Sequence, residues 1–139
     1  MNHRLDSLWY KVMDIESVRE YCLSFPHATE NVQWGNDLVF KIAGKMFAVT
    51  VLEGASKYCL SFKCTEEKFA ELIERDAIAP APYSARYHWV ALETFDALSD
   101  KELKALLRNS YDLVCEKLPK KAKAELESKP SAAEKKKRR

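Results

Sequence analysis

The spacing of apolar residues changes from a helical period to an alternating one and back, and this constrains the fold more than any other feature. Apolar side chains recur every three or four residues over 15–25, as on one face of a helix. From residue 31 the period is two, so that Leu38, Phe40 and Ile42 share one face of an expected strand. A chain that carries both periods in succession is predicted to be α+β.

The same patterns predict three helices around one antiparallel sheet. Side chains suited to N-caps, Asp14, Thr65 and Ser99, begin the helices expected at 14–25, 65–76 and 99–117. Strands are expected at 37–42, 46–52, 58–63 and 87–92. Because Gly44 allows the positive φ of a hairpin turn, the first two strands are expected to pair. Helices would cover one face of the sheet and leave the other face open.

Charge divides the chain into a domain and a tail. Residues 13–118 carry twelve Lys or Arg and seventeen Asp or Glu, a net charge of −5, whereas 119–139 sum to +6. We therefore expect an extension at 1–12, a domain at 13–121 and a basic, disordered or frayed-helical tail at 122–139. The acidic domain charge lends no support to nucleic-acid binding, while the basic run Lys135–Arg139 would attract any polyanion.

Export, membrane insertion and catalysis find no support in the sequence. No apolar run approaches the ~20 residues that span a bilayer, and residues 1–12 lack a signal-peptide pattern, which predicts a cytoplasmic protein. His3, His27 and His88 have no metal-binding spacing, so we expect no metal, no cofactor, no small-molecule substrate and no enzymatic activity, although a Cys and a His can still meet in the fold. The cysteines, expected to be reduced and buried, are Cys22, Cys59, Cys64 and Cys115.

Five segments of the domain occur in an order that matches a known family: Trp34-Gly35, Leu38–Lys41, Gly44–Ala48, Pro80–Val90 and Leu103–Lys121. In these segments the chain resembles the MmcQ/YjbR family of small bacterial proteins, over residues 14–121. The resemblance implies an α+β fold of frataxin-like (CyaY-like) topology, related to the double-wing arrangement of certain DNA-binding domains. It also implies DNA binding, an inference that rests on fold analogy.

The first candidate nucleic-acid site is the segment 83–89, where aromatic residues alternate with basic ones. Tyr83, Arg86, Tyr87 and His88 would supply flat apolar surfaces for bases and a forked donor for phosphate oxygens. On the expected strand, Tyr87 and Trp89 share one face and His88 takes the other. The alternative is that Trp89 and Tyr87 belong to the core and that Arg86 pairs with a carboxylate.

The second candidate is a group of lysines on neighbouring strands. Lys41 and Lys45 flank the Ala43-Gly44 turn, and Lys57 and Lys63 bracket the third expected strand. On one exposed sheet surface, their ammonium groups would contact phosphates without regard to base sequence. The alternative is a solvated sheet surface whose edge lysines prevent aggregation.

Three hypotheses of function follow. The first is a non-enzymatic protein that binds DNA through these lysines and the aromatic segment. The second is a protein-interaction or accessory module that docks a protein partner through the Pro-rich aromatic loop and has no nucleic-acid role. The third, suggested by the frataxin-like fold, is iron binding by carboxylates of the second helix, which on a surface helix are normally just solvated: Glu66, Glu67, Glu71, Glu74 and Asp76.

Overall fold

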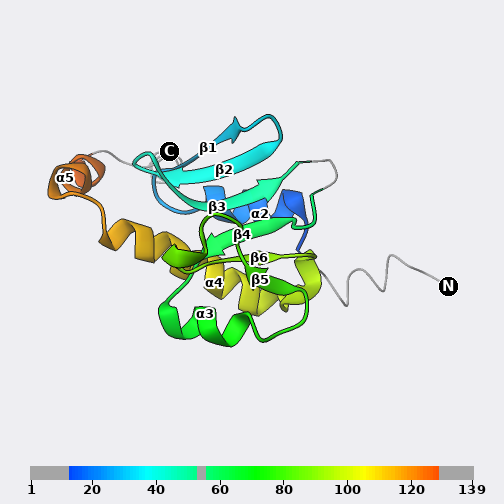
Figure 1. Ribbon diagram of the computed structural model, residues 1–139. Coiled ribbons are helices and arrows are strands. Elements are labelled where there is room, and N and C mark those ends of the chain that lie inside the picture. Colours follow the sequence, from blue (N-terminus) through cyan, green and yellow to red (C-terminus); the bar gives the residue numbers. More distant parts are fainter. Residues whose placement is uncertain (1–12, 53–55, 129–139) are drawn as a thin grey trace.

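A six-stranded antiparallel sheet with helices on one face forms the body of the structure (Figure 1). The computed structural model describes residues 13–52 and 56–128. The extension predicted at 1–12 and the basic run Lys135–Arg139 lie outside the described residues. The predicted α+β class with one antiparallel sheet is confirmed, whereas the likeness to frataxin stays a prediction.

The strands follow the order β1-β2-β3-β4-β6-β5 across the sheet. Each strand is antiparallel to its neighbours. The bounds are β1 (Ala28–Gln33), β2 (Asp37–Ile42), β3 (Lys45–Val51), β4 (Leu60–Lys63), β5 (Ile78–Pro80) and β6 (Trp89–Leu92). The four strands for which the sequence predicted bounds correspond to β2, β3, β4 and β6.

The two edge strands, β1 and β5, have no clear apolar alternation. The inner face of β1 carries Glu30, whose carboxylate oxygens accept hydrogen bonds of 2.9 and 2.7 Å from the Arg19 guanidinium of the first helix. A paired charge therefore stands where the pattern would show an apolar residue. β5 is three residues long and ends at Pro80, which an edge strand tolerates because one side of it has no partner.

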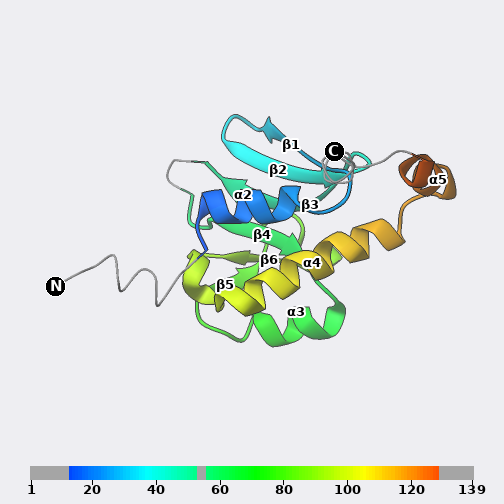
Figure 2. The same cartoon turned by 180° about the vertical axis from the view of Figure 1, so that it is seen from behind.

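The helices α2 (Ile15–Leu23), α3 (Glu66–Leu72) and α4 (Asp100–Glu116) match the three predicted ones. Each predicted N-cap side chain accepts a hydrogen bond of 2.8–3.1 Å from the backbone N–H three residues later: Asp14, Thr65 and Ser99. Figure 2 shows these helices together over one face of the sheet. Two short 3₁₀ helices, η1 (Ala85–Tyr87) and η2 (Phe95–Ala97), flank β6. Among the described residues, none of the helices combines the length and apolar character needed to cross a bilayer; the cytoplasmic location stays a prediction.

A fourth helix, α5 (Lys120–Ser128), corrects the predicted end of the domain. The boundary expected at residue 121 falls inside this helix, and its Ala122 and Leu126 are partly buried against the main core. These two side chains are four residues apart and so share one helix face, a stripe too short to stand out among the surrounding lysines and glutamates. The folded part therefore extends at least to Ser128.

The main core fills the space between the sheet and the helices. At its centre the fully buried Phe47 of β3 packs against three other rings, with centroid distances of 5.4–6.4 Å: Phe25, Phe40 and Tyr111. Aromatic pairs at such distances stabilise a core beyond the area that they bury. Phe25 follows α2, Phe40 and Phe47 belong to β2 and β3, and Tyr111 belongs to α4. The cluster therefore packs α2 and α4 against the sheet.

A β-bulge at Phe47 connects α4 to the sheet. The pairing of β2 with β3 shifts between Phe40 and Lys41, which leaves Phe47 as an extra residue. The buried Ser110 of α4 donates a hydrogen bond of 2.6 Å to the Phe47 carbonyl and accepts one of 3.0 Å from the Lys63 backbone N–H. One hydroxyl group thus satisfies two buried backbone groups of different strands.

Candidate functional site on the open face of the sheet

The sheet face opposite the helices carries small and apolar residues along its centre. Because directly paired residues of antiparallel strands share a face, the register defines one row across all six strands: Asn31, Val39, Val49, Ser61, Ala91 and Ala79. A second, small apolar cluster covers part of this face; Trp89, Ala91 and Ala81 are buried in it, and Met46, Val49 and Tyr58 pack against them. The middle of the open face is therefore an apolar surface, and the row of residues that crosses it has mostly small side chains.

A cavity of about 540 Å³ lies over this floor. Its volume is within the ~300–1,000 Å³ of typical ligand sites. The strands supply Asp37, Met46, Val49, Ser61 and Trp89, while the β1–β2 turn and the segment after β5 supply the remaining lining residues: Trp34, Ala81, Pro82, Tyr83 and Ser84. An apolar base with a few polar groups at its margin suits a flat, partly polar ligand.

Two aromatic residues of this rim have left-handed backbone conformations. Trp34 (φ 53°) is 69% exposed, and Tyr83 (φ 66°) is fully exposed. A left-handed conformation costs an L-residue about 1–2 kcal/mol. Trp34 and Gly35 both have positive φ, and a turn with two such residues usually carries Asn-Gly at these positions. Strain of this kind, kept with a large exposed side chain, is typical of functional sites.

The segment 83–89 divides into exposed and buried residues. Trp89 is 6% exposed and belongs to a core cluster, as the alternative expected of it, whereas Tyr83 and Arg86 are exposed. The strand predicted from residue 87 begins only at Trp89, because Tyr87 belongs to η1 and His88 is left-handed (φ 64°). Tyr87 therefore does not share a strand face with Trp89, and its ring, 53% exposed, lies 4.9 Å below the Arg86 guanidinium carbon.

His88 does not join the other predicted site residues. Its ring contacts the ring of Phe69 in α3, with centroids 5.6 Å apart, on the helix-covered side. Its carbonyl accepts hydrogen bonds from the Cys64 backbone N–H (2.9 Å) and thiol (3.3 Å). His88 thus holds the loop against β4 and α3.

The four predicted lysines do not form one patch. Lys41 and Lys63 lie on the open face, in register with Met46 and Trp89 respectively. Lys45 pairs with Ile42 and so takes the opposite face, because alternation and the bulge turn it toward the helix side. Lys57 lies in the loop before β4, beyond the other end of β3, with its ammonium group 5.8 Å from the Tyr58 ring centre.

Lys63 connects the open face to the aromatic segment. Its ammonium group donates a hydrogen bond of 2.9 Å to the Tyr87 carbonyl. Burial lowers the pKa of this amine, and the nearby Lys117 lowers it further. Lys63 therefore positions η1 above the sheet as well as carrying charge.

Acidic side chains are concentrated on the helices. α2, α3 and α4 carry nine of them: Glu16, Glu20, Glu66, Glu67, Glu71, Asp100, Glu102, Asp112 and Glu116. Several pair with neighbouring bases; Arg75, for example, bridges Glu71 and Glu102. No group of three His, Cys, Asp or Glu within residues 13–52 and 56–128 is arranged to hold a metal ion. In the described strands, the charged residues that the register places on the open face are Asp37, Lys41 and Lys63.

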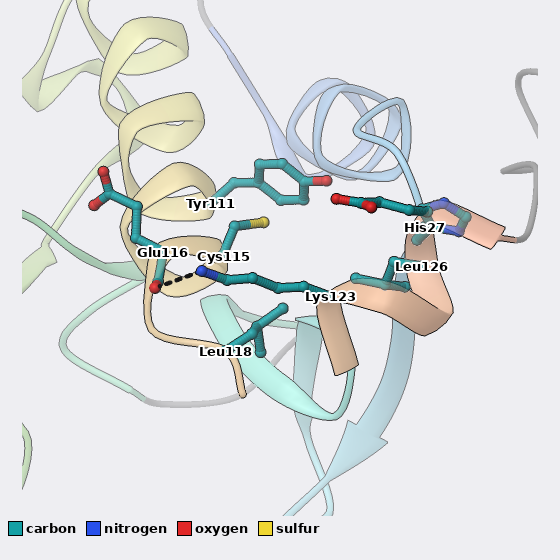
Figure 3. A pocket seen from close by; sticks show the side chains of 8 residues that line it. His27, Tyr111, Cys115, Glu116, Leu118, Lys123 and Leu126 are labelled. Atoms are coloured by element: carbon teal, nitrogen blue, oxygen red, sulfur yellow. Dashed lines mark hydrogen bonds between the residues drawn. The ribbon is translucent and has the colours of Figure 1, made fainter. Parts of the chain in front are cut away.

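A second groove, of about 460 Å³, lies where α5 meets α4 (Figure 3). His27, Tyr111, Cys115 and Lys123 face one another across it. Two of its polar side chains already have partners: the Tyr111 hydroxyl donates a hydrogen bond of 2.6 Å to the Pro26 carbonyl, and Lys123 donates one of 3.0 Å to the Glu116 carbonyl. The groove is therefore the seam along which α5 packs.

The thiols are neutral at physiological pH. All four cysteines are free; Cys22 and Cys64 are buried as predicted, whereas Cys59 and Cys115 are partly exposed. Burial raises the pKa of Cys22 to about 12 and the pKa values of Cys59 and Cys64 to about 11. Burial also raises the pKa of Cys115. Since the thiolate is the nucleophile, none of these groups is activated for catalysis.

The cavity brings in residues that sequence reasoning did not assign to a site, namely Trp34, Asp37, Met46 and Ser61. One signal was present: a tryptophan precedes Gly35 in a turn, where Asn is usual. The others became neighbours only through the pairing of β2, β3 and β4.

Comparison with known proteins gives a family for the chain. The family model YjbR matches residues 23–113. A Deinococcus radiodurans protein with a DUF419 domain is 31% identical, with a TM-score of 0.72 over 83% of this chain and 88% of that one. A Pseudomonas syringae protein shares the fold at 19% identity, with a TM-score of 0.60 over 73% of this chain and 98% of that one. No curated protein matches the chain. The matched region spans the whole sheet and most of α4, and the chain belongs to the YjbR (MmcQ/YjbR) family.

Proposed function

We propose that this protein is a non-enzymatic nucleic-acid-binding protein and that the open face of its sheet is the binding surface. The observation that carries the proposal is that the exposed aromatic side chains Trp34 and Tyr83 line an apolar cavity, with the exposed Tyr87 and Arg86 following in the same segment. Aromatic rings of this kind stack with bases of any sequence and contribute about 1–3 kcal/mol per base.

Charge supports the same surface. Lys41 and Lys63 lie on the open face, and the exposed Arg86 belongs to η1, whose Tyr87 carbonyl accepts a hydrogen bond from Lys63. We therefore expect phosphates near the cavity to meet these three cations. The helices α2, α3 and α4, which carry nine acidic residues, lie on the other side of the sheet (Figure 2). The net charge of −5 over residues 13–118 therefore does not oppose binding at this face as strongly as the sum suggests.

The proposed surface contains only some of the binding residues that were predicted from the sequence. Tyr83, Arg86, Tyr87, Lys41 and Lys63 remain in the proposed surface. Lys45, Lys57 and His88 leave it, because they lie on the helix side, beyond the end of β3 and against Phe69 respectively.

A protein partner is the second candidate. The observation in its favour is that exposed apolar side chains also occur away from the cavity, at Val32 (54% exposed) and Leu52 (37%). Such residues suit a protein interface. Binding there would depend little on salt, whereas phosphate contacts weaken steeply as salt rises.

The test is fluorescence anisotropy of labelled single-stranded and duplex DNA with the full chain and with a chain ending at Ser128. We expect the shortened chain to bind at low salt. In that chain, Lys41→Ala and Arg86→Ala should each reduce the slope of log affinity against log salt by about 0.7–0.9. Lys45→Ala, on the opposite face, is the matched control and should leave the slope unchanged. If only the full chain binds, the basic run Lys135–Arg139 accounts for the binding and the proposal fails.

A further inference from the structure

We propose that the cavity between Trp34 and Tyr83 receives one unpaired nucleobase, so that the open face selects single-stranded over duplex nucleic acid. This inference rests on the proposed function and specifies its substrate. Both aromatic residues line the same cavity, although 49 positions separate them in the sequence, and both keep most of their surface exposed to solvent.

The availability of ring faces is the first argument. In a duplex each base is stacked on both sides and its edge is paired, so its faces are not accessible to a side chain. The rings of Trp34 (69% exposed) and Tyr83 (fully exposed) can only stack with a base that has left such a stack. Their arrangement over a cavity is therefore of use for unpaired bases.

The lining of the cavity is the second argument. Its floor is apolar, formed by Met46, Val49 and Trp89, and suits the face of a planar ring. Its polar groups are the Asp37 carboxylate and the Ser61 and Ser84 hydroxyls, which can hydrogen-bond to the edge of a base. The negative charge of Asp37 disfavours a phosphate inside the cavity, so the base enters and the phosphate stays outside.

The surroundings of the cavity favour a strand over a free nucleotide. Lys41 lies on the open face beside Met46 of the floor, and Arg86 follows the rim residue Tyr83 by three positions. The Arg86–Tyr87 pair adds a further stacking surface outside the cavity. A ligand that fills all of these positions has one base in the cavity, phosphates beside these cations and a second base near Tyr87. Only a strand with several linked nucleotides has these groups in one molecule.

The backbone of the rim supplies the matched variants. Asn tolerates the left-handed conformation that Trp34 and Tyr83 adopt, so Trp34→Asn and Tyr83→Asn remove the ring without disturbing the turn or the charge. Trp34→Tyr keeps a ring at the same position. Val32→Thr replaces one exposed methyl group by a hydroxyl on the opposite face of the sheet, close to Trp34 in sequence, and serves as control.

The experiment measures the affinity of the full chain and these variants for a short single strand, for its duplex and for a mononucleotide. We expect the native chain to bind the single strand at least tenfold more tightly than the duplex. Trp34→Asn and Tyr83→Asn should each weaken single-strand binding by about 5- to 150-fold, the equivalent of one lost stacking contact. Trp34→Tyr should retain most of the affinity, and Val32→Thr should change nothing.

The outcomes separate this inference from the proposed function. Equal affinity for single strand and duplex, unchanged in both Asn variants but weakened by Arg86→Ala, overturns the base-binding cavity and leaves nucleic-acid binding intact. A mononucleotide that binds as tightly as the strand, with the same sensitivity to the Asn variants, overturns the assignment to a strand. Loss of all binding in the chain ending at Ser128 overturns the proposed function itself. Thermal unfolding of each variant verifies that the loss of affinity does not come from unfolding.

Discussion

The two faces of the sheet are built from the same strands but have different roles. The helix-covered face holds the main core, in which Phe40, Phe47 and Phe62 are fully buried. The open face buries three residues in its own cluster and leaves Trp34 and Tyr83 exposed around a cavity. Strand alternation supplies both faces at once, so stability can be concentrated on one while the other remains available for a ligand.

Charge follows the same division. The acidic side chains of α2, α3 and α4 stand on the covered side, while Lys41 and Lys63 belong to the open face. A net charge summed over the domain hides this separation. What matters to a polyanion is the local charge within about a Debye length, ~8–10 Å at ordinary salt.

The largest expected effect compares one large ring from each face. Phe47→Ala should lower the free energy of unfolding by about 3–5 kcal/mol, because it opens a cavity at the centre of the main core. Trp89→Ala should cost about 3 kcal/mol, at the low end of that range, because its ring already borders an open cavity. Urea unfolding measures both. A greater loss for Trp89→Ala than for Phe47→Ala would show that the open face carries the stability.

The next effect concerns the contact between α4 and the bulge. Ser110→Ala leaves the buried Phe47 carbonyl and the Lys63 N–H without their partner and should cost about 1–3 kcal/mol. Asn109→Ala, one residue earlier on α4, is the control and should change stability by less than about 0.5 kcal/mol. Equal values for the two variants would mean that the Ser110 hydroxyl does not hold the bulge.

The free energy of unfolding should depend on alkaline pH through a thiol of the main core, on the helix-covered side of the sheet. Burial raises the pKa of Cys22 to about 12 from an ordinary value of 9.0, so the fold favours its neutral thiol. The stabilisation is complete below the unfolded pKa and is lost as pH rises toward the folded pKa, because the unfolded chain loses its proton first. One unit above the unfolded pKa, Cys22 should contribute a loss of about 1.4 kcal/mol. Urea unfolding between neutral and alkaline pH tests this, and Cys22→Ala should show a shallower decline than the native chain.

The smallest expected effect on stability is at the rim of the open face. Trp34→Asn should change the free energy of unfolding by no more than about 1 kcal/mol, and in the stabilising direction, since it relieves a strained left-handed residue whose side chain is largely exposed. Thermal unfolding gives the sign. A clear destabilisation would identify Trp34 as a structural residue and weaken the contrast between the two faces.

Much of the fold was predictable because it is encoded locally. The N-caps Asp14, Thr65 and Ser99 and the alternation in β2 depend on residues close in sequence, and each prediction was confirmed. β1 was not predicted with bounds because its inward Glu30 is neutralised by Arg19, eleven residues away. The packing of α5 on the core was not predicted, because its apolar stripe consists of two residues and the core residues that they contact lie elsewhere in the chain.

The candidate site was predictable only in part. Tyr83 and Arg86 were assigned from composition, because aromatic rings beside a guanidinium group are suited to base stacking and phosphate contact. The lysine patch failed at Lys45, since the bulge at Phe47 and the alternation of β3 set which face each lysine takes. A shift of one residue in register reverses the direction of a side chain, and no local pattern reports such a shift.

The sequence by itself determined the α+β class, the helix starts and the shared face of Leu38, Phe40 and Ile42, because propensity, capping and periodicity act over a few residues. Only the tertiary structure decided that Trp34 and Tyr83 rim one cavity and that Lys41 and Lys45 lie on opposite faces. It also decided that α5 belongs to the fold. These features depend on strand order, register and the docking of distant segments, which arise from contacts between residues far apart in the chain.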